Sequence, residues 1–420
     1  MTATREIDLL VGGAREVATP LGAKPRAGAR LNEIAVQSGA AVAIDGDRIV
    51  AVAPEAELRG RFRARRELDA AGGTLVPGFV DAHTHPVFAG TREDEFEMRT
   101  RGATYMEIAR AGGGILSSVR GVRAASNEEL LAKLLVHLDR FLELGTTTVE
   151  AKSGYGLSLD DELRCLAVIV EANRIHPVEL VPTFLGAHAI PPEHADSREG
   201  YVRSLVDEML PAVHEMGGVE FCDVFTEDGA FGIDESREIL TRARELGFGL
   251  RLHVDQLSQL GGAELAAELG AASADHLEFV GDAGIEALAG AGVIPVLCPL
   301  VPLYLRVERE VPGRRMVDAG LAPALATDFN PGSCYLQSIP EVMTWAALRL
   351  RFSAAECLAG ATINAAASLG RAAEIGTLEP GKRADLCVLD VPNHRHLVYE
   401  MGRNPVRAVV CAGRVAWERG

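Results

Sequence analysis

Short hydrophobic runs recur along the central part of the chain, and helix-like stretches separate them. Such a run is typical of a strand buried in a parallel sheet, and the stretch between two runs is typical of a crossover helix. The pattern predicts helices that include residues 128–144, 160–173, 234–246 and 262–269. It predicts eight strands, at residues 74–80, 146–152, 179–187, 219–225, 249–254, 273–277, 293–299 and 324–327.

Eight strand–helix units in a row close into a barrel whose helices form the outer ring. The predicted fold class is therefore α/β, a (β/α)8 TIM-like barrel. The two ends of the chain have a different pattern. Residues 6–73 show short strand-like runs with an Asp45-Gly46 turn, and strand-like runs return at 384–390 and 406–417. Asp-Gly between hydrophobic runs is typical of a β-hairpin.

We expect the two ends to build one small β domain, from residues 1–75 and 376–420, beside a barrel of residues 76–375. The alternative is two separate terminal ribbons. Residues 287–305 carry no charge over about the length of a membrane span. Because this segment contains Pro295, Pro299 and Pro302, it is better explained as a helix end, a buried strand and a loop.

The charge balance excludes one class of partner. With 42 basic and 59 acidic side chains, the chain has a formal net charge of −17, which argues against a nucleic-acid surface. Its seven cysteines have no paired spacing, and the first residues show no signal peptide. A reducing cytoplasm is the expected location.

Metal-binding side chains stand at the carboxyl ends of the predicted strands, where a barrel enzyme places its reactive groups. His83 and His85 follow the first strand, and residues two apart on an extended segment point to the same side. His253, His276 and Asp328 follow the fifth, sixth and eighth strands. Imidazole and carboxylate ligands suit Zn²⁺ or a similar ion such as iron.

Each of these residues alone has a simpler explanation. A His-x-His pair occurs by chance, a strand-end histidine often binds a backbone carbonyl, and Asp328 could cap a helix. The occurrence of all five residues at the ends of predicted strands favours a metal site. Six further histidines are expected to be structural or solvated: His137, His176, His194, His214, His394 and His396.

Several motifs resemble the amidohydrolase superfamily. They are PGFVDAHTHP with the histidines and aspartate above, the closing EPGKRADLCVLD, and FAGTREDEFEMR, GATYMEIARAGGGI, TTTVEAKSGYGL, FLGAHAIPPE, FCDVF, LHVDQ, GGAELAAELGAASADHLE and ALATDFNPGSC. These segments span nearly the whole chain. The resemblance implies a metal-bearing barrel and a small β-sandwich made from both termini. It also implies metal-dependent hydrolysis of the ring amide of 4-imidazolone-5-propanoate to N-formimidoyl-L-glutamate, a step of histidine degradation.

The resemblance also implies roles for individual residues. His83, His85, His253 and Asp328 would hold one metal ion, Zn or Fe, while His276 would lie beside the attacking water and act with Asp328 in catalysis. The predicted fourth strand has no lysine, which argues against a second, lysine-bridged ion; Lys152 on the second strand would pair with a carboxylate or line the cavity. The implied substrate contacts are Arg92, Tyr155, His188, Gln256, Asn330, Gly332, Ser333 and, more weakly, Tyr105.

Several of these contacts have structural alternatives. Arg92 could bind the substrate's carboxylate through its planar fork, or form a salt bridge with a neighbour among Glu93, Asp94, Glu95 and Glu97. Tyr155 could only plug the barrel mouth, and Gln256 could face outward. The segment 302–315 is the least family-like and leaves the access route open. Rival functions are a deaminase or cyclic amidohydrolase of another ring, and a catalytically silent scaffold. A homodimer is the expected assembly.

Overall fold

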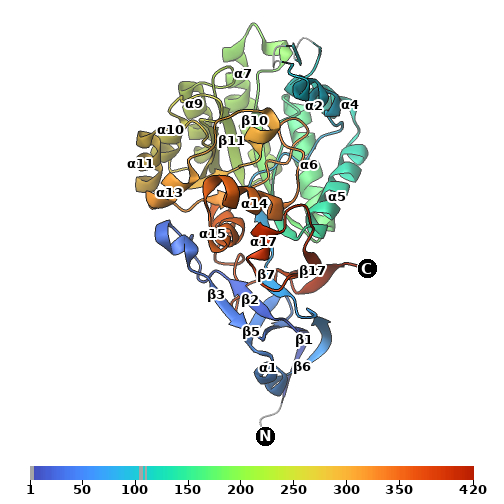
Figure 1. Cartoon of the computed structure of the whole chain (residues 1–420). Coiled ribbons are helices and arrows are strands. Elements are labelled where there is room, and N and C mark those ends of the chain that lie inside the picture. The colour runs from blue at the N-terminus through green and yellow to red at the C-terminus, as the bar shows by residue number, and fades with distance from the viewer. Residues whose placement is uncertain (1–3, 104–106, 109–110) are drawn as a thin grey trace.

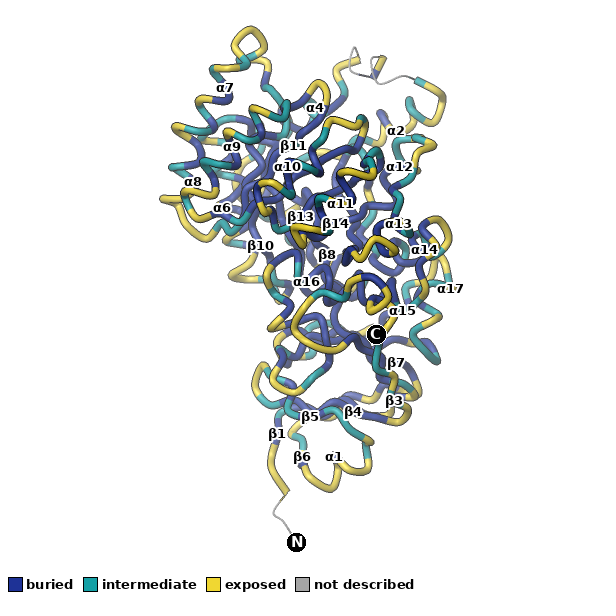
Figure 2. The backbone as a smooth tube through the Cα atoms, turned by 90° about the vertical axis from the view of Figure 1, so that its left-hand side faces the viewer, coloured by how far each residue is buried: buried dark blue, intermediate teal, exposed yellow. Residues whose placement is uncertain are grey.

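The computed structural model describes residues 4–103, 107–108 and 111–420. Tyr105 lies outside the described residues. Figure 1 shows a barrel surrounded by helices, with a smaller group of strands beneath it that contains the N-terminal segment. The buried strands of the barrel form its centre, and most exposed residues lie on outer helices and loops (Figure 2).

In the described part of the chain, eight parallel strands form the barrel sheet in the order β15-β14-β13-β12-β11-β10-β9-β8. This confirms the predicted fold class. The strands are β8 (Phe79–Asp81), β9 (Thr146–Lys152), β10 (Glu179–Ala187), β11 (Phe221–Thr226), β12 (Gly249–Val254), β13 (Ser273–His276), β14 (Ile294–Leu297) and β15 (Ala324–Leu325).

The first predicted strand is wrong in one respect, because the structure divides residues 74–80 between two sheets. Thr74–Pro77 forms β7, which pairs with strands from both chain ends, and the barrel strand β8 begins at Phe79. Gly78 separates them, and a Cβ at this position would lie 2.4 Å from Thr147 Oγ1. The chain therefore changes sheets at a residue that packs too closely for any side chain.

The barrel closes between β8 and β15 through side-chain and loop contacts. Asp81 accepts hydrogen bonds from the backbone N–H of Thr327 at 3.0 Å and from its hydroxyl at 2.5 Å. Just beyond, the N–H of Asp328 donates to His83 O at 3.0 Å, and the N–H of His85 donates to Phe329 O at 2.9 Å. These bonds place the His-x-His pair and Asp328 side by side.

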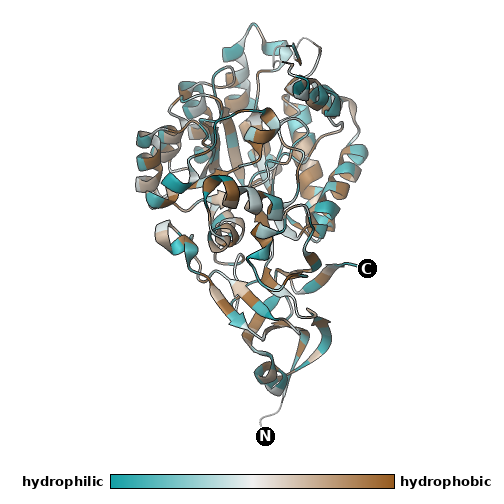
Figure 3. Cartoon of the chain, viewed as in Figure 1, coloured by the Kyte–Doolittle hydropathy of each residue, from teal (hydrophilic) through white to brown (hydrophobic). Residues whose placement is uncertain are grey.

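Helices cover the outside of the barrel and carry both hydrophilic and hydrophobic residues (Figure 3). The four predicted helices are confirmed within two residues at each end. The α-helices are α1 (Glu55–Arg61), α2 (Glu93–Thr100), α4 (Ile115–Ala124), α5 (Asn127–Glu143), α6 (Leu159–Ile175), α7 (Arg198–Ser204), α8 (Leu210–Met216), α9 (Ile233–Glu245), α10 (Gly262–Leu269), α11 (Asp282–Ala291), α12 (Val301–Leu305), α13 (Gly313–Asp318), α14 (Ile339–Leu350), α15 (Ala354–Ala359), α16 (Ala365–Ser368) and α17 (His396–Tyr399).

The chain ends form two further sheets, with the orders β5-β4-β1-β6 and β18-β17-β16-β7-β2-β3 among the described residues. The second sheet combines segments from both termini, as predicted. In this sheet β7 pairs with β2 from the N-terminal part and with β16 from the C-terminal part. The chain then continues from β7 into the barrel strand β8. The strands are β1 (Arg5–Gly12), β2 (Glu16–Thr19), β3 (Ala35–Ser38), β4 (Ala40–Asp45), β5 (Arg48–Pro54), β6 (Phe62–Asp69), β16 (Leu386–Leu389), β17 (Val406–Cys411) and β18 (Arg414–Glu418).

The uncharged segment 287–305 forms the end of α11, the buried strand β14 and the short helix α12. The expected helix end and strand are found, and a helical turn takes the place of part of the expected loop. Among the described residues, no helix combines the length and the apolar character needed to cross a bilayer. All seven cysteines are described, and each is free and buried.

His137 on α5 is a buried histidine outside the predicted site. Its Nδ1 lies 3.0 Å from Pro86 O, and its ring packs against Phe88 and Phe329. Burial is the largest influence on the imidazole and lowers its pKa from 6.5 to about 4. Below pH 6.5 the His137 imidazole is therefore protonated in the unfolded chain but stays neutral in the folded chain until the pH is much lower.

We expect His137 to contribute to acid sensitivity. Above the unfolded pKa, the neutral His137 ring does not reduce the free energy of unfolding. As the pH falls toward the folded pKa, the free energy of unfolding decreases by about 2–3 kcal/mol. His137→Asn keeps a donor for Pro86 O but does not titrate. Urea midpoints of metal-free protein between pH 7 and 4 should fall less steeply for this variant than for the wild type; parallel slopes would contradict the assignment.

Candidate metal and substrate site

The five metal-capable residues predicted at strand ends lie together at one end of the barrel. His83 and His85 follow β8, His253 lies in β12, His276 ends β13 and Asp328 follows β15. Their ligand atoms form two overlapping groups, His83–His253–His276 and His83–His85–Asp328, with the atoms of each group within 4.8 Å of one another. His83 belongs to both groups and lies at the centre of the cluster.

Short distances connect the members of the cluster. Asp328 Oδ1 lies 3.3 Å from His85 Nε2 and 3.5 Å from His83 Nε2. His253 Nε2 lies 3.3 Å from His85 Nε2. The ring centroids of His276 and His83 are 5.0 Å apart. All five residues are at most 3% exposed, so water does not screen these groups.

Burial favours the neutral form of three imidazoles of the cluster, those of His83, His85 and His276. It lowers the pKa of His83 to about 4, lowers that of His85, and lowers that of His276 well below its ordinary value. Burial alone would raise the pKa of Asp328, but the adjacent imidazoles of His83 and His85 hold it well below the usual range. Neutral imidazoles and an ionised carboxylate are the forms that bind a metal ion.

The chemistry of the donor atoms fits a cation. His83 Nε2 and Asp328 Oδ1 are buried and have no hydrogen-bond partner among the described residues. The Nε2 atoms of His85 and His253 face each other, although two unprotonated nitrogens repel one another unless they share a proton or an ion. Orphaned nitrogen and oxygen atoms that converge in this way fit a divalent metal.

Two residues of the cluster have strained backbone. His276 has φ 77° and Asp328 has φ 51°, in the left-handed region that favours glycine. Aspartate, asparagine and histidine are enriched in this region among residues with a side chain, but positive φ is uncommon even for them. Strain of this kind persists only where the surrounding structure imposes it and is concentrated at functional sites.

A buried ion network lies directly beneath the cluster. Lys152 Nζ donates to Glu150 Oε1 at 2.8 Å and to Asp223 Oδ2 at 2.7 Å, and it lies 3.9 Å from Asp275 Oδ2. Arg251 Nη2 donates to Asp275 Oδ2 at 3.2 Å. All five side chains are fully buried. Lys152 therefore pairs with carboxylates, one of the two roles expected for it.

The network extends to two of the histidines. Asp275 Oδ2 lies 2.6 Å from His83 Nδ1, and Asp223 Oδ2 lies 3.0 Å from His253 Nδ1. The hydrogen bond at His83 Nδ1 fixes the proton there and leaves the lone pair of Nε2 free for an ion, and the negative charge of Asp223 favours the same arrangement in His253. Our sequence reasoning missed Asp223, Arg251 and Asp275. A charged residue inside an otherwise hydrophobic strand was the signal that could have identified them.

Arg92 begins α2 and forms the salt bridge that was its structural alternative. Its Nε and Nη2 bind the Glu95 carboxylate at 2.9 and 2.6 Å. The remaining amine, Nη1, packs on Gly332, where a Cβ would lie 2.1 Å away. Only glycine at position 332 allows the guanidinium to occupy this place. Glu95 thus orients Arg92, and one amine stays free of that pair.

Tyr155 lies in a loop after β9 that a buried carboxylate holds. Glu162 accepts hydrogen bonds from the N–H groups of Gly154, Gly156 and Leu157 at 3.0, 2.8 and 2.8 Å. The Tyr155 ring centroid lies 6.1 Å from that of His85, and the residue is 4% exposed. Its ring is therefore beside the cluster in a fixed loop.

His188, after β10, stacks on His85 with ring centroids 5.0 Å apart and an interplanar angle of 20°. Burial, together with His85 and His253, lowers its pKa well below the ordinary value. Its Nδ1 lies 3.0 Å from Gly154 O, so the proton of the neutral ring is on Nδ1. Nε2 is then an acceptor.

Gln256 lies in the loop after β12, and it is buried rather than outward-facing. Glu227 accepts from the N–H groups of Gln256 and Leu257 at 3.1 and 2.8 Å. Asp255 accepts from the N–H groups of Leu260 and Ala263 at 3.0 and 3.1 Å. Two buried carboxylates therefore hold this loop, as Glu162 holds the loop of Tyr155.

Asn330 uses its side chain within its own turn. Its Oδ1 accepts from the N–H groups of Gly332 and Ser333 at 2.8 and 2.7 Å, and its Nδ2 donates to Asp328 O at 2.7 Å. Ser333 Oγ lies 3.3 Å from Asp328 Oδ2. The structure thus places Asn330 as a residue that positions Asp328 and Gly332.

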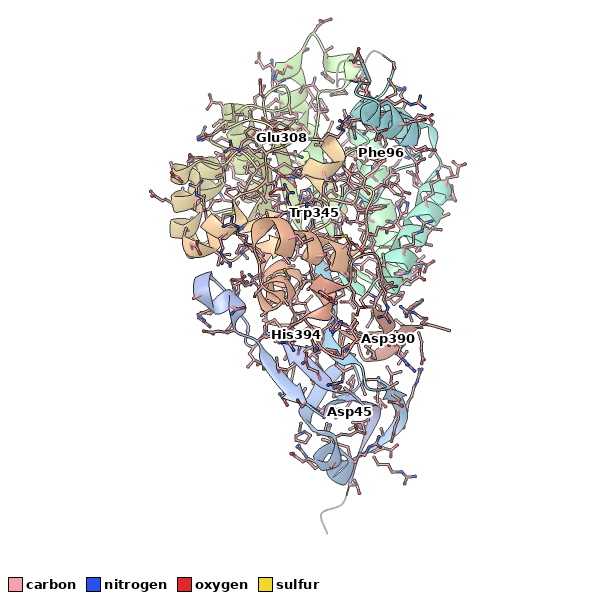
Figure 4. The ribbon with its side chains drawn as sticks, viewed as in Figure 1. Asp45, Phe96, Glu308, Trp345, Asp390 and His394 are labelled. Carbon is pink, nitrogen blue, oxygen red and sulfur yellow. The ribbon has the colours of Figure 1, made fainter. Side chains whose placement is uncertain are left out.

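The segment 302–315 contains α12 and the start of α13 and reaches across to α2. Arg306 Nη1 donates to Arg99 O at 2.9 Å, and Arg99 Nη1 donates to Tyr304 O at 3.3 Å. The rings of Phe96 and Tyr304 lie 5.8 Å apart. Figure 4 shows Phe96 and Glu308 at the end of the barrel away from Asp45 in the terminal sheets. This segment therefore borders the same end of the barrel as the cluster.

Glu278, two residues after His276, is another group that our sequence reasoning missed. It is 2% exposed, and neither carboxyl oxygen has a hydrogen-bond partner among the described residues. Burial, with a smaller contribution from the negative charges of Asp328 and Glu227, raises its pKa to about 8. A buried and unpartnered carboxyl in the middle of ADHLEF gives no pattern that a sequence could reveal.

Comparison with known proteins identifies a family. Residues 74–416 match the model of the Amidohydrolase family. A protein of Symbiobacterium thermophilum named imidazolonepropionase is 50% identical over 420 residues, which cover 99% of each chain. One of the same name from Myxococcus xanthus is 49% identical over 413 residues, covering 98% of this chain and 97% of the other.

Solved structures have the same fold. An adenosine deaminase from Xanthomonas campestris with bound zinc aligns with a TM-score of 0.73 and 21% identity, covering 98% of this chain and 93% of the other. A 5-methylcytosine deaminase from Klebsiella pneumoniae aligns with a TM-score of 0.74 and 17% identity, covering 98% of each chain. At these identities the likeness concerns the fold alone.

Proposed function

The chain belongs to the amidohydrolase family, and from this premise we propose that it hydrolyses the ring amide of 4-imidazolone-5-propanoate to N-formimidoyl-L-glutamate in histidine degradation. The observation that carries the proposal is the convergence of four histidines and one aspartate at the end of the barrel. The full-length relatives named imidazolonepropionase support the choice of substrate.

His83, His85, His253 and Asp328 would hold one divalent ion, Zn or Fe. When bound, such an ion lowers the pKa of water from 15.7 to about 7 and polarises a carbonyl. Asp275 and Asp223 orient His83 and His253 for this task through their Nδ1 atoms. A homodimer in the cytoplasm stays a prediction.

Asp328 is the proton carrier in this proposal. Its carboxylate is ionised in the resting site and can accept a proton from the attacking water at Oδ1 or Oδ2. It then delivers that proton to the ring nitrogen as the C–N bond breaks, because one positioned carboxylate can serve both steps. His276, neutral and strained in its backbone, hydrogen-bonds the attacking oxygen or the oxyanion.

The pocket residues bind the rest of the substrate. His188 offers Nε2 as an acceptor to the ring N–H, since its Nδ1–H is used by Gly154 O. Tyr155 and Gln256 contact the ring from two loops that buried carboxylates hold in place. Arg92 binds the propionate through Nη1, beside Gly332 and Ser333, while Glu95 keeps its guanidinium in position.

The direct test uses metal-loaded protein and 4-imidazolone-5-propanoate, with loss of the ring's ultraviolet absorbance as the readout. We expect turnover that a chelator abolishes and that Zn²⁺ or Fe²⁺ restores, because the ring is opened through the metal site. An analogue with a methyl group in place of the carboxylate should have a much higher KM, since Arg92 then has no partner. Turnover that survives complete removal of metal would contradict the proposal.

The rival deaminase function is tested by measuring the release of ammonia from cytosine or guanine. Both are neutral rings without a carboxylate, so we expect no activity. Ammonia release, together with no change in the absorbance of the imidazolone, would favour the deaminase instead. Lack of activity with every ring, in protein that retains its metal, would favour the silent scaffold.

A further inference from the structure

Buried carboxyl groups at the active end of the barrel fall into two classes. Glu95, Glu162, Glu227 and Asp255 each accept hydrogen bonds from loop N–H groups or from an arginine, so a structural role accounts for them. Glu278 is buried to the same degree, but both its oxygens are unpartnered among the described residues. A structural role does not account for its carboxyl group.

The backbone around Glu278 is fixed. The N–H of Phe279 donates to Asp255 O at 2.7 Å, and Arg309 Nε donates to Glu278 O at 2.9 Å. The guanidinium of Arg309 also lies 4.8 Å from the centre of the Phe279 ring. The backbone that carries the carboxyl group is therefore held just beyond the end of β13.

A buried polar group without a partner costs folding free energy of about 1–3 kcal/mol, so it calls for a ligand or another explanation. Glu278 follows β13 and Asp328 follows β15, so both lie at the carboxyl end of the same parallel barrel sheet. Asp328 is the residue that delivers a proton to the leaving nitrogen in the proposed reaction. The leaving nitrogen is thus the part of the substrate that a carboxyl at position 278 would meet.

The reaction creates hydrogen-bond donors at that place. The closed imidazolone ring has one N–H. When the water oxygen bonds to the carbonyl carbon and the C–N bond breaks, both water protons pass to the N–C–N group, one through Asp328 and one from the new carboxylic acid. The opened product carries two carboxylates and a planar amidinium with three N–H donors, so the overall charge is unchanged.

We propose that Glu278 is a catalytic residue that accepts hydrogen bonds from the amidinium that forms as the ring opens. The inference rests on the proposed function. In its ionised form, which the positive charge of the amidinium favours, the Glu278 carboxylate has two acceptor oxygens and matches two parallel N–H donors of an amidinium, as a carboxylate matches a guanidinium. Because the donors on the leaving nitrogen appear only as the ring opens, Glu278 lowers the barrier rather than strengthening substrate binding.

Two variants of the metal-loaded enzyme separate this role from others. Glu278→Met removes both acceptors and should lower kcat by about 100-fold, while KM changes by less than about 3-fold. Glu278→Gln keeps one acceptor oxygen and should lose about 10-fold in kcat. Bound metal should stay the same in both. A raised KM with normal kcat, or loss of metal, would overturn the proposal.

Thermal stability gives an independent readout. Glu278→Met replaces an unpartnered carboxyl by an apolar side chain of similar length, so its melting temperature should equal or exceed that of the wild type. Glu356 is the matched control, because it is also buried but caps α15 and pairs with Arg314. Glu356→Met should melt earlier. If Glu278→Met is destabilised as Glu356→Met is, Glu278 is structural and the proposal fails.

Product binding tests the contact directly. The wild type should bind N-formimidoyl-L-glutamate at least about 10-fold more tightly than N-formyl-L-glutamate, which has an amide in place of the amidinium. Glu278→Met should lose this preference. An unchanged preference would overturn the inference, whereas wild-type protein that fails to open the imidazolone would instead remove the proposed function.

Discussion

Replacement of Asp328 by asparagine is expected to lower kcat by about 10³-fold, because the variant loses the group that accepts and returns the proton. Asparagine has the same shape and tolerates the left-handed φ of 51° at this position, so the fold should be retained. Alanine would be a weaker test, since it adds backbone strain at the same place. The measurement is turnover at saturating metal, with bound metal determined in parallel.

The control for this variant is Asp81→Asn. Asp81 is also buried at the same seam of the barrel, but its side chain binds Thr327 rather than an imidazole ring, and burial raises its pKa to about 7. A neutral side chain is therefore tolerated there, and we expect a loss in kcat of less than about 10-fold, since this carboxyl transfers no proton in the reaction. Normal turnover by Asp328→Asn would remove this residue from the mechanism.

Lys152→Met is expected to destabilise the protein by about 3–5 kcal/mol, because it leaves buried carboxylates without their cation. Lys152 binds Glu150 and Asp223 directly, and Asp223 in turn holds His253. The variant should therefore also bind metal about 10–100-fold more weakly. Urea unfolding of metal-free protein measures the first effect, and titration of the apo-protein with Zn²⁺ measures the second.

Lys382→Met is the matched control, since Lys382 is also a buried lysine but its ammonium donates to Ala372 O, far from the histidines. Its loss should cost about 1 kcal/mol and leave metal affinity unchanged. If both variants bind metal equally well, the network beneath the site serves stability alone.

Much of the barrel could be predicted because its strands are buried on both faces and its helices on one. Strands therefore appear in the sequence as continuous hydrophobic runs and helices as mixed stretches, and the two alternate from Thr146 onward. The first strand could not be placed correctly, since residues 74–80 form one uncharged run and the change of sheet at Gly78 depends on contact with Thr147. Such packing is not encoded in a local pattern.

The candidate metal cluster could be located from the sequence because a parallel barrel brings strand ends together. Five predicted residues lie in one cluster for this reason. The pairing of Asp223, Arg251 and Asp275 could not be predicted, since the partners of each charged residue come from other strands. The role of Asn330 in its own turn could not be predicted either, because it depends on how the side-chain amide is oriented toward the N–H of Gly332.

The anchoring of two active-end loops by Glu162 and Glu227 has a consequence for how such a pocket can change. The carboxylates hold backbone N–H groups, so the loops keep their course whatever side chains stand at their tips. Tyr155 and Gln256 could then be exchanged without refolding the segments that carry them. A pocket of this construction can acquire a new ring specificity by single substitutions, while the machinery that opens the ring stays intact.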